Sequence, residues 1–499
     1  MLQMSTTWQW SSPACATSGI ERRRLVLLAL LAFSLALSLS FSAQAATIVA
    51  SSDIQAAIDG ARPGDTVLVG PGEYTAFEVD RPLQIQGQGA PVLHAAIQKP
   101  AIIISSNSVT LSGFNIKGVR KDINAKFNYY MQNPAAAAGQ RLDQPNAAIV
   151  VRGSDVSLRD SIIFGAQVGV QAENAENLSL QNMTLESCDS GASISRCRSS
   201  RVEECRFSNC NKFGLDAEEC DEIALHNNSV VKTTNTGFLV KGSERCSIQD
   251  NLFSGNTFGL SLWRASFNEV RGNRAEHNYY GILVTDSSNN NTIADNVANE
   301  NSRSEIVKGF GEGISLQENS SFNLVIRNTA RKNFNGLEVS RGCKYNVVYG
   351  NTAADNSHGL RMNENRNNLI FGNNFQNNNI NAYENISLNI WNTTTGNYYS
   401  DYRGKDDNGD GIGDQPYTLP GPESKSRDYH PLVRPQRNAS LDEAALKEEV
   451  RKYARYGLAD NEIPVFRRQG GTIVIASRVP SGPPRWGDSK PLDVTVPPN

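Results

Sequence analysis

The sequence has little net charge and few side chains that bind soft metal ions. Its 499 residues carry 48 Lys and Arg against 51 Asp and Glu, a balance that does not suggest nucleic-acid binding. The five His and five Met are scattered, so the residues themselves do not support copper binding. The eight Cys contain no Cys-x-x-Cys motif, which argues against a zinc site.

Helix signals are also scarce, because Asn and Gly fill the gaps between short apolar runs. What is present is a regular spacing of glycine. Successive repeat glycines lie 22 or 23 residues apart, except for one interval of 32 residues. A period of this size predicts an array of stacked structural units. The repeat glycines are Gly169, Gly191, Gly214, Gly237, Gly259, Gly281, Gly313, Gly336 and Gly359.

Each unit is predicted to contain two short strands. Apolar residues occupy the first and third positions after each glycine, as in Leu260 and Leu262, which predicts a strand with one buried face. Another apolar residue follows about eleven residues after the glycine and predicts a second strand. Strands this short must pair in parallel with those of the next unit, so the predicted fold is an all-β solenoid.

Asparagine repeats in the same register. One set lies 13 to 15 residues after its glycine, and a second set lies 19 or 20 residues after it. Asn tolerates left-handed backbone and its amide can bond its copy in the next unit, so both sets predict ladders at the corners of the coils. The first set is Asn182, Asn228, Asn251, Asn273, Asn296, Asn328, Asn351 and Asn373; the second is Asn256, Asn278, Asn301, Asn333, Asn356 and Asn378.

Two pairs of cysteines share corner positions in successive units. Cys188 aligns with Cys210, and Cys197 aligns with Cys220. Stacked coils lie about 4.8 Å apart, which is within the Cα separation that a disulfide spans. Each pair is therefore either a disulfide or a stack of buried thiols.

Residues 1–45 have the pattern of a secretory signal peptide. Arg22 to Arg24 precede an apolar run, and Ala43-Gln44-Ala45 forms a cleavage site. We expect cleavage after Ala45 and a periplasmic or extracellular mature chain; the alternative is a membrane anchor. A cap is predicted over residues 46–75, with a capping box that begins at Ser52 and a helix that covers the open end of the solenoid.

Two segments resemble known families. The segment Asp53 to Tyr74, DIQAAIDGARPGDTVLVGPGEY, resembles the opening of right-handed parallel β-helix proteins of the pectin-lyase-like class. The segment Gly396 to Tyr417, GNYYSDYRGKDDNGDGIGDQPY, followed by Asp428 to Leu432, resembles the closing segment of NosD-type proteins, with Tyr399 in place of their tryptophan. The resemblance implies a right-handed β-helix over 76–433, closed by 396–433. Residues 434–499 would then form a small α/β appendage of helix, strand and loose tail.

The resemblance to NosD-type proteins implies a non-catalytic role in maturing the copper centres of nitrous oxide reductase, alongside a membrane transporter. A surface protein that only binds a glycan or a protein is the second interpretation. A polysaccharide lyase, epimerase or hydrolase is the third and weakest. Such enzymes need a base near the sugar carboxylate or a pair of acids, and the sequence lacks Asp-Pro-His-Asp, Gly-His-Gly and Arg-Ile-Lys motifs.

A calcium loop is the strongest ligand motif. Oxygen-bearing residues alternate around a glycine as in positions 1 to 9 of a calcium-binding loop, but Tyr417 stands where the bidentate Glu belongs. We expect structural Ca²⁺ here; the alternative is an acidic turn without metal. The candidate ligands are Asp406, Asn408, Asp410, Ile412 and Asp414.

The outer face of the glycine-led strands is the second candidate site. An exposed Trp suits stacking on a sugar ring, and carboxylates with a lysine suit hydroxyl or uronate recognition. The alternative is an ordinary solvated face in which Lys241 only pairs with Glu218. The candidate residues are Glu173, Asp216, Glu218, Lys241 and Trp263.

Overall fold

The computed structural model describes residues 45–96, 99–120, 146–302, 310–424, 426–436, 442–444, 446, 462–469 and 472–480. The chain divides into two compact units, Met1–Ala46 and Thr47–Asn499, and the second unit holds the solenoid. The predicted signal peptide lies outside the described residues, apart from Ala45.

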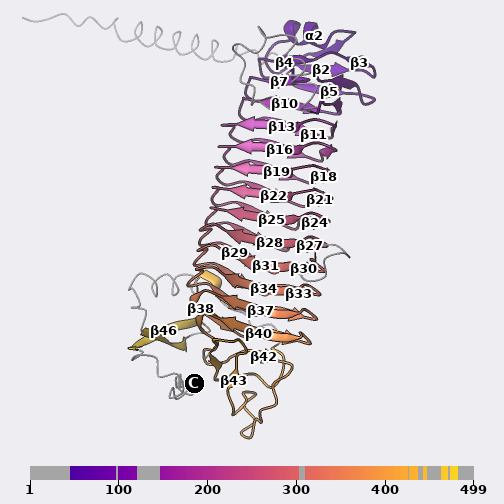
Figure 1. Cartoon of the computed structure of the whole chain (residues 1–499). Helices are drawn as coiled ribbons and strands as arrows, with labels where there is room; N and C mark the ends of the chain where they lie inside the picture. Colours follow the sequence, from indigo (N-terminus) through magenta and orange to yellow (C-terminus); the bar gives the residue numbers. More distant parts are fainter. Residues whose placement is uncertain are drawn as a thin grey trace, which may run out of the picture. The chain divides into compact units, whose positions relative to one another are not determined.

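Three parallel sheets run along the solenoid, and successive coils add one strand to each sheet (Figure 1). Leu260 of one coil lies opposite Ile282 of the next, in the predicted register. Because neighbouring coils are hydrogen-bonded strand to strand, residues one repeat apart in sequence become neighbours in space. The predicted all-β, right-handed parallel β-helix is confirmed.

The sheets are named here A, B and C. Sheet A consists of β1 (Thr47–Ala50), β2 (Thr66–Val69), β5 (Gln84–Gly87), β8 (Thr110–Ser112), β11 (Ser157–Arg159), β14 (Ser179–Gln181), β17 (Arg201–Glu203), β20 (Ala224–His226), β23 (Ser247–Gln249), β26 (Glu269–Arg271), β29 (Thr292–Ala294), β32 (Leu324–Ile326), β35 (Val347–Tyr349), β38 (Arg366–Phe371) and β41 (Leu388–Ile390). Sheet B consists of β3 (Glu73–Tyr74), β6 (Val92–His94), β9 (Asn115–Lys117), β12 (Ile162–Phe164), β15 (Thr184–Glu186), β18 (Arg206–Ser208), β21 (Ser229–Val231), β24 (Leu252–Ser254), β27 (Arg274–Glu276), β30 (Val297–Asn299), β33 (Thr329–Arg331), β36 (Thr352–Ala354), β39 (Asn374–Gln376) and β42 (Tyr398–Tyr399). Sheet C consists of β4 (Phe77–Val79), β7 (Ile102–Ile104), β10 (Ala147–Val151), β13 (Val168–Glu173), β16 (Ser190–Ser195), β19 (Phe213–Glu218), β22 (Thr236–Lys241), β25 (Phe258–Trp263), β28 (Tyr280–Thr285), β31 (Glu312–Leu316), β34 (Asn335–Ser340), β37 (His358–Asn363) and β40 (Ile380–Asn385).

Each coil therefore has three strands, whereas the sequence predicted two. The predicted strands are those of sheets C and A, and sheet B was missed. In β15, Leu185 is the single buried residue between Thr184 and Glu186. One inward residue gives no alternation of apolar and polar positions, so the pattern could not reveal this strand.

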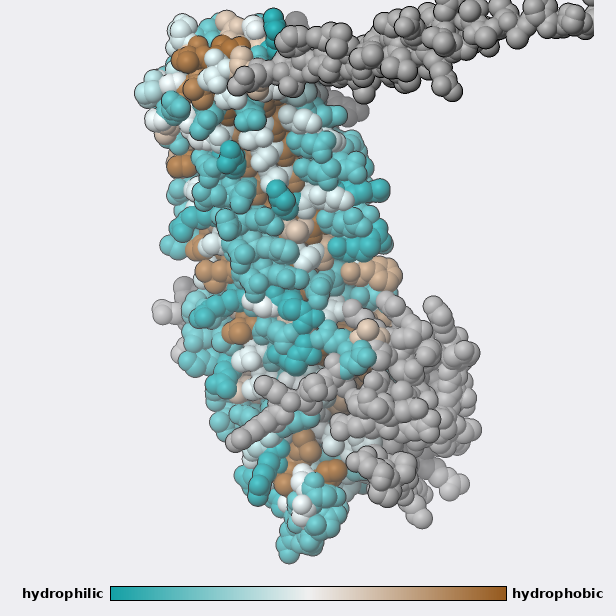
Figure 2. Space-filling model, turned by 180° about the vertical axis from the view of Figure 1, so that it is seen from behind, coloured by the Kyte–Doolittle hydropathy of each residue, from teal (hydrophilic) through white to brown (hydrophobic). Residues whose placement is uncertain are grey.

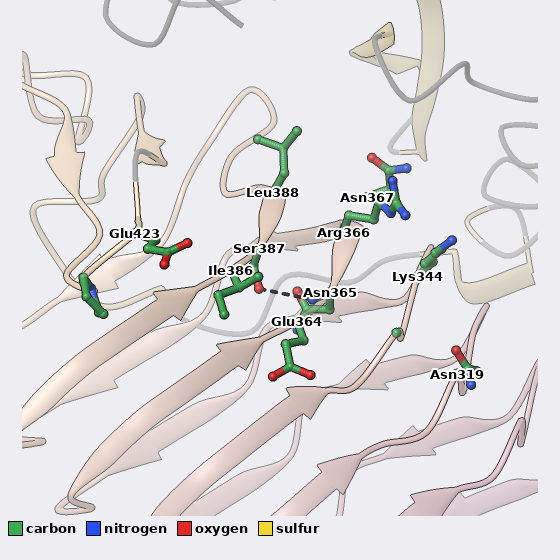
Figure 3. A pocket seen from close by; sticks show the side chains of 12 residues that line it. Asn319, Lys344, Glu364, Asn365, Arg366, Asn367, Ile386, Ser387, Leu388 and Glu423 are labelled. Atoms are coloured by element: carbon green, nitrogen blue, oxygen red, sulfur yellow. Dashed lines mark hydrogen bonds between the residues drawn. The ribbon is translucent and has the colours of Figure 1, made fainter.

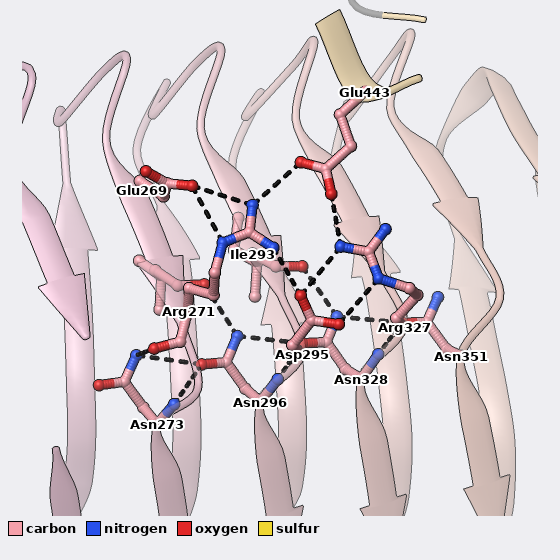
Figure 4. A network of polar contacts seen from close by, with 11 residues as sticks. Glu269, Arg271, Asn273, Ile293, Asp295, Asn296, Arg327, Asn328, Asn351 and Glu443 are labelled. Atoms are coloured by element: carbon pink, nitrogen blue, oxygen red, sulfur yellow. Dashed lines mark hydrogen bonds and ion pairs between the residues drawn. The ribbon is translucent and has the colours of Figure 1, made fainter. Parts of the chain in front are cut away.

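Buried asparagine ladders join the coils. Asn273 Nδ2 donates to Asn296 Oδ1, and Asn296 Nδ2 donates to Asn328 Oδ1, each at 3.0 Å (Figure 4). The two predicted ladders are confirmed from Asn228 to Asn373 and from Asn256 to Asn378. A third ladder was not predicted; it comprises Asn268, Asn291, Asn323, Asn346, Asn368 and Asn389.

The assignment of Asn182 to the first ladder was wrong. Asn182 is exposed, has a φ of 50° and donates to Asp160 at 2.8 Å. Met183 is fully buried and Cys205 occupies the same position one coil on, where Asn228 begins the ladder. An apolar side chain therefore fills this corner in the early coils.

The cysteines fill equivalent corner positions. The seven described cysteines are free and buried. Burial raises the pKa of Cys188 to about 11 and that of Cys210 to about 12. Cys197 and Cys220 share a side-chain hydrogen bond. The structure thus has stacked thiols at both positions, the second of the two predicted alternatives.

Helix α2 (Ile54–Gly60) begins after β1. Asp53 Oδ1 accepts a hydrogen bond from the Ala56 backbone N–H at 3.2 Å, so the helix cap is Asp53 and not the predicted Ser52. Ile58 is fully buried, and the helix contacts β1, β2 and β4. Burial of one face therefore fixes this short helix against the first strands.

The closing segment folds around a buried carboxylate and adds β43 (Tyr417–Thr418) and β44 (Arg427–Asp428). Asp428 is fully buried and accepts hydrogen bonds from the Asn397 N–H at 2.7 Å and the Tyr399 hydroxyl at 3.1 Å. Tyr399, which replaces the tryptophan of NosD-type proteins, stacks on Tyr417 with ring centroids 3.7 Å apart. The replacement keeps an aromatic ring in the core and adds a hydroxyl that satisfies the carboxylate.

Part of the C-terminal appendage is tied to sheet A. Glu443 forms ion pairs with Arg271, at 3.0 Å, and with Arg327 (Figure 4). An antiparallel pair, β45 (Glu462–Gln469) and β46 (Thr472–Pro480), contains the predicted strand. The predicted helix and loose tail fall mostly outside the described residues.

Substituting Asn296→Ala is expected to lower the free energy of unfolding by about 2–4 kcal/mol. It leaves the Asn273 N–H and the Val270 carbonyl buried without partners, and each such group costs about 1–3 kcal/mol. Urea unfolding followed by circular dichroism measures the loss. Asn211→Ala is the control, because Asn211 is exposed and its amide bonds only an exposed pair partner, Asp189. Equal losses in the two variants would contradict a stabilising ladder.

Candidate ligand-binding face

The outward side chains of sheet C form three rows along successive coils. Row 1 lies one residue before the repeat glycine, row 2 two residues after it, and row 3 four residues after it. Row 1 contains Phe258, Tyr280, Glu312, Asn335 and His358; row 2 contains Asp216, Leu239, Ser261, Leu283, Ser315, Glu338, Arg361 and Tyr383; row 3 contains Glu173, Ser195, Glu218, Lys241, Trp263 and Thr285.

Three of the predicted residues meet in row 3. Lys241 Nζ lies 2.5 Å from Glu218 Oε1 and 5.9 Å from the centre of the Trp263 ring. The Trp263 indole N–H donates to Asp286, and 41% of the residue is exposed. Lys241 thus pairs with Glu218, as the alternative interpretation expected, and also lies over an exposed aromatic ring.

Glu173 does not join this group. It lies in row 3 two coils before Glu218, with Ser195 between them. Its carboxylate pairs with Arg196. The arrangement therefore separates Glu173 from the Trp263 ring.

Asp216 lies beside the group, in row 2. Its pKa is raised to about 6, first by burial and then by the charge of Glu218, while Lys241 acts in the opposite direction. Its Oδ1 is buried and has no hydrogen-bond partner among the described residues. A carboxylate in this position is costly, and the cost falls when the group is protonated.

An apolar strip continues row 2. Leu239 is 8% exposed and Leu283 is 9% exposed, although both face outward. In row 1 the rings of Phe258 and Tyr280 stack with centroids 5.1 Å apart. Together with Trp263 in row 3, these side chains give the face an apolar floor with aromatic residues on both sides.

A second polar group follows on the next coils, and the sequence analysis missed it. A side-chain hydrogen bond joins Glu312 and Glu338, and Arg361 Nη1 lies 2.9 Å from Glu338 Oε1. Glu338 is only 5% exposed. Burial, and next the contact with Glu338, raise the pKa of Glu312 well above its usual value. The two carboxyls therefore share one proton near neutral pH.

Part of this group could have been found from the repeat. Glu338 and Arg361 occupy the row 2 position, as Asp216 does. Glu312 was hidden, because it precedes its glycine and ends the interval of 32 residues. A Cβ at Gly336 would meet the inward side chains of Asn356 and Ala353, so the glycine faces the core and its predecessor faces outward.

The predicted calcium loop is closed by its own hydrogen bonds. Asp406 accepts from the Asp410 and Gly411 N–H groups at 3.1 and 3.0 Å, and Asp414 accepts from the Asp407 N–H at 2.8 Å. Across the described residues, no group of three His, Cys, Asp or Glu is placed to hold a metal ion. Ca²⁺ binding by Asp406, Asn408, Asp410, Ile412 and Asp414 stays a prediction.

A separate cavity of about 940 Å³ lies at the corner beyond β37 and β40 (Figure 3). Its lining mixes the charged side chains of Lys344, Glu364 and Glu423 with the exposed Ile386 and Leu388. None of the predicted site residues lines it. On the side of the solenoid seen from behind, hydrophilic side chains predominate and apolar ones are scattered (Figure 2).

Replacing Asp216 by Asn is expected to stabilise the protein at alkaline pH only. Because the folded-state pKa lies above the ordinary value of 3.8, the folded chain holds the proton more tightly, and stability falls as pH rises from about 4 to 6. Asp216→Asn should therefore gain about 1–2 kcal/mol near pH 8 and little near pH 3, measured by urea unfolding. Asp160→Asn, at an exposed corner, should change stability by under about 0.5 kcal/mol at both pH values. A gain that does not depend on pH would contradict a buried carboxylate.

Solved structures of several sugar-acting and phage proteins are similar. The A-module of mannuronan C-5 epimerase AlgE6 from Azotobacter vinelandii is 13% identical, with a TM-score of 0.48 over 68% of this chain and 96% of that one. DFA-IIIase from Arthrobacter chlorophenolicus A6, in complex with GF2, is 16% identical, with a TM-score of 0.45 over 60% and 86%. The Dettilon tailspike protein is 14% identical, with a TM-score of 0.45 over 62% and 67%.

No curated protein matches the chain. In the part of the chain that the structure describes, no helix is both long and apolar enough to cross a membrane. A family model described as periplasmic copper-binding protein (NosD) matches residues 84–309 and 230–404. These matches cover more than half of the 499 residues, and the chain therefore belongs to the NosD family.

Proposed function

We propose that this chain is a non-catalytic, extracytoplasmic NosD-type protein that binds a glycan or a protein through the outer face of sheet C. The observation that carries the proposal is the exposed Trp263 ring beside the Lys241–Glu218 pair. An aromatic ring next to charged hydrogen-bonding groups is a common way to hold a sugar ring. The family description and the signal-peptide pattern support a location outside the cytoplasm.

A glycan is the favoured ligand. Rows 1 and 3 place aromatic rings on both sides of the strip formed by Leu239 and Leu283. The polar groups lie at the two ends of this strip, at Asp216 and at Glu338. Evenly spaced rungs of sheet C suit an extended, repetitive ligand better than a compact one.

Trp263→Ala is expected to weaken glycan binding by about tenfold or more, because it removes the stacking surface. A glycan array identifies the ligand, and calorimetry measures the affinity of both proteins. Phe164→Ala is the matched control, since Phe164 is an exposed aromatic residue on sheet B. Unchanged affinity in Trp263→Ala would remove this site. A lyase absorbance assay on uronates, run beside the array, tests the enzymatic alternative, and product formation would overturn a non-catalytic role.

A role in the maturation of copper centres is the second candidate, and the family description favours it. The described cysteines are buried and five of them have pKa values raised to about 11 or 12, so they are poor ligands for incoming copper. This chain would then act through contact with nitrous oxide reductase and a membrane transporter rather than by carrying copper itself.

Deleting the gene tests this role. The purified reductase is expected to lose copper content and its copper absorption bands, and the loss should be restored by the wild-type chain. A chain in which all seven described cysteines are replaced by Ser or Ala, and which still folds, should also restore it, because the role does not use them as ligands. Full copper content in the deletion strain would contradict the role.

A further inference from the structure

We propose that Glu312, Glu338 and Arg361 form a charge-balanced subsite on sheet C that binds a neutral, hydroxyl-rich sugar unit rather than a uronate. This inference rests on the proposed glycan binding and names the class of sugar. It concerns a different part of the face from Trp263, two or more coils further along.

The two carboxyls are held together by the coil register. Glu312 lies opposite Asn335 in row 1, and Asn335 Nδ2 donates to Glu338 Oε2 at 2.8 Å. Gln317 Nε2 donates to Glu312 Oε2 at 3.2 Å. With Glu312 bonded directly to Glu338, the pair keeps one proton and carries one negative charge instead of two.

Arg361 balances that remaining charge. Its guanidinium lies 2.9 Å from Glu338, so the three side chains sum to zero. The nearby Arg341 pairs with Glu318 at 2.8 Å, and this pair is also neutral. Burial lowers the pKa of His358, so its ring is uncharged near neutral pH, and burial raises that of Tyr280. The described residues therefore give a uronate no net attraction here.

Unmet hydrogen-bonding capacity lies beside the pair. Asn335 is 3% exposed, and its Oδ1 has no partner among the described residues. Nδ1 of His358, the next residue in row 1, is also buried without a partner. A buried, unsatisfied acceptor costs about 1–3 kcal/mol, which a ligand hydroxyl would recover. Hydroxyls both donate and accept, as this mixture of an acid proton and open acceptors requires.

Aromatic rings border the subsite. The Phe334 and His358 rings are 5.4 Å apart, and the His358 and Tyr383 rings are 5.7 Å apart. Phe310, which is 60% exposed, lies 5.7 Å from Phe334. Rings in this arrangement offer apolar surface to the C–H face of a sugar while the acid pair contacts its hydroxyls.

The carboxyl spacing also argues for binding rather than hydrolysis. Glycosidases hold their two carboxyls about 5–5.5 Å apart when they retain, or about 6.5–9.5 Å apart when they invert, the anomeric configuration. Glu312 and Glu338 are hydrogen-bonded to each other, which leaves no room for a sugar carbon or a water between them.

Calorimetric titration of the full chain with a neutral hexasaccharide and with hexagalacturonate tests the proposal. The wild-type protein should bind the neutral sugar at least about tenfold more tightly. Glu338→Gln leaves the charge of Arg361 unbalanced, so uronate binding should rise by about tenfold relative to neutral binding. Arg361→Gln should weaken binding of both sugars. Glu276→Gln is the matched control, because Glu276 is a partly buried carboxylate paired with Arg274 on sheet B.

A pH series adds a readout that a merely structural role would not move. As pH rises through the raised pKa of Glu312, the pair becomes two carboxylates and neutral-sugar binding should weaken. Glu312→Gln keeps a neutral donor, so its binding should stay constant over that range. Thermal unfolding checks that each variant folds.

The outcomes separate this inference from the proposed function. Sugar binding that falls in Trp263→Ala but keeps the wild-type ratio of neutral to uronate affinity in Glu338→Gln would overturn the subsite and leave the proposed function standing. A wild-type preference for the uronate would overturn the subsite as well. Binding of neither sugar, with no hit on the array, would overturn both.

Discussion

Parallel pairing of each strand with its copy in the next coil is the constraint on which the rest of the structure depends. It converts a spacing of 22 or 23 residues into direct contact, as for Leu260 and Ile282. The same register stacks buried amides at three corners, where an unpaired Asn would be costly. Rows of outward side chains on sheet C follow from it, since a sheet repeats its face every rung.

The outer face of sheet C concentrates the unusual chemistry of the chain. A cation–aromatic pair lies at one end, a hydrogen-bonded pair of carboxyls lies at the other, and apolar side chains lie between them. Buried carboxyls and exposed aromatic rings both cost stability. Their gathering on one face, while hydrophilic side chains predominate on the side seen from behind (Figure 2), is what singles it out as a binding surface.

The sequence could predict whatever repeats, and it could not predict what depends on a single residue or on a change of register. The solenoid, two of its three sheets and two asparagine ladders follow from periodic positions. Leu185 and its equivalents in sheet B leave no periodic pattern, and Asn182 is one residue out of register with Asn228. Trp263, Lys241 and Glu218 were grouped correctly, because they share one row. Glu312 was missed, because the longer interval and the inward turn of its glycine conceal its direction.

Hydroxyl-radical footprinting of the free and ligand-bound chain tests the binding face most directly. If sheet C holds the ligand, oxidation of Trp263, Phe310 and Tyr383 should fall on binding, while oxidation of Phe164 on sheet B stays the same. Protection of Phe164, or of residues lining the corner cavity, with Trp263 and Tyr383 unchanged, would contradict the account.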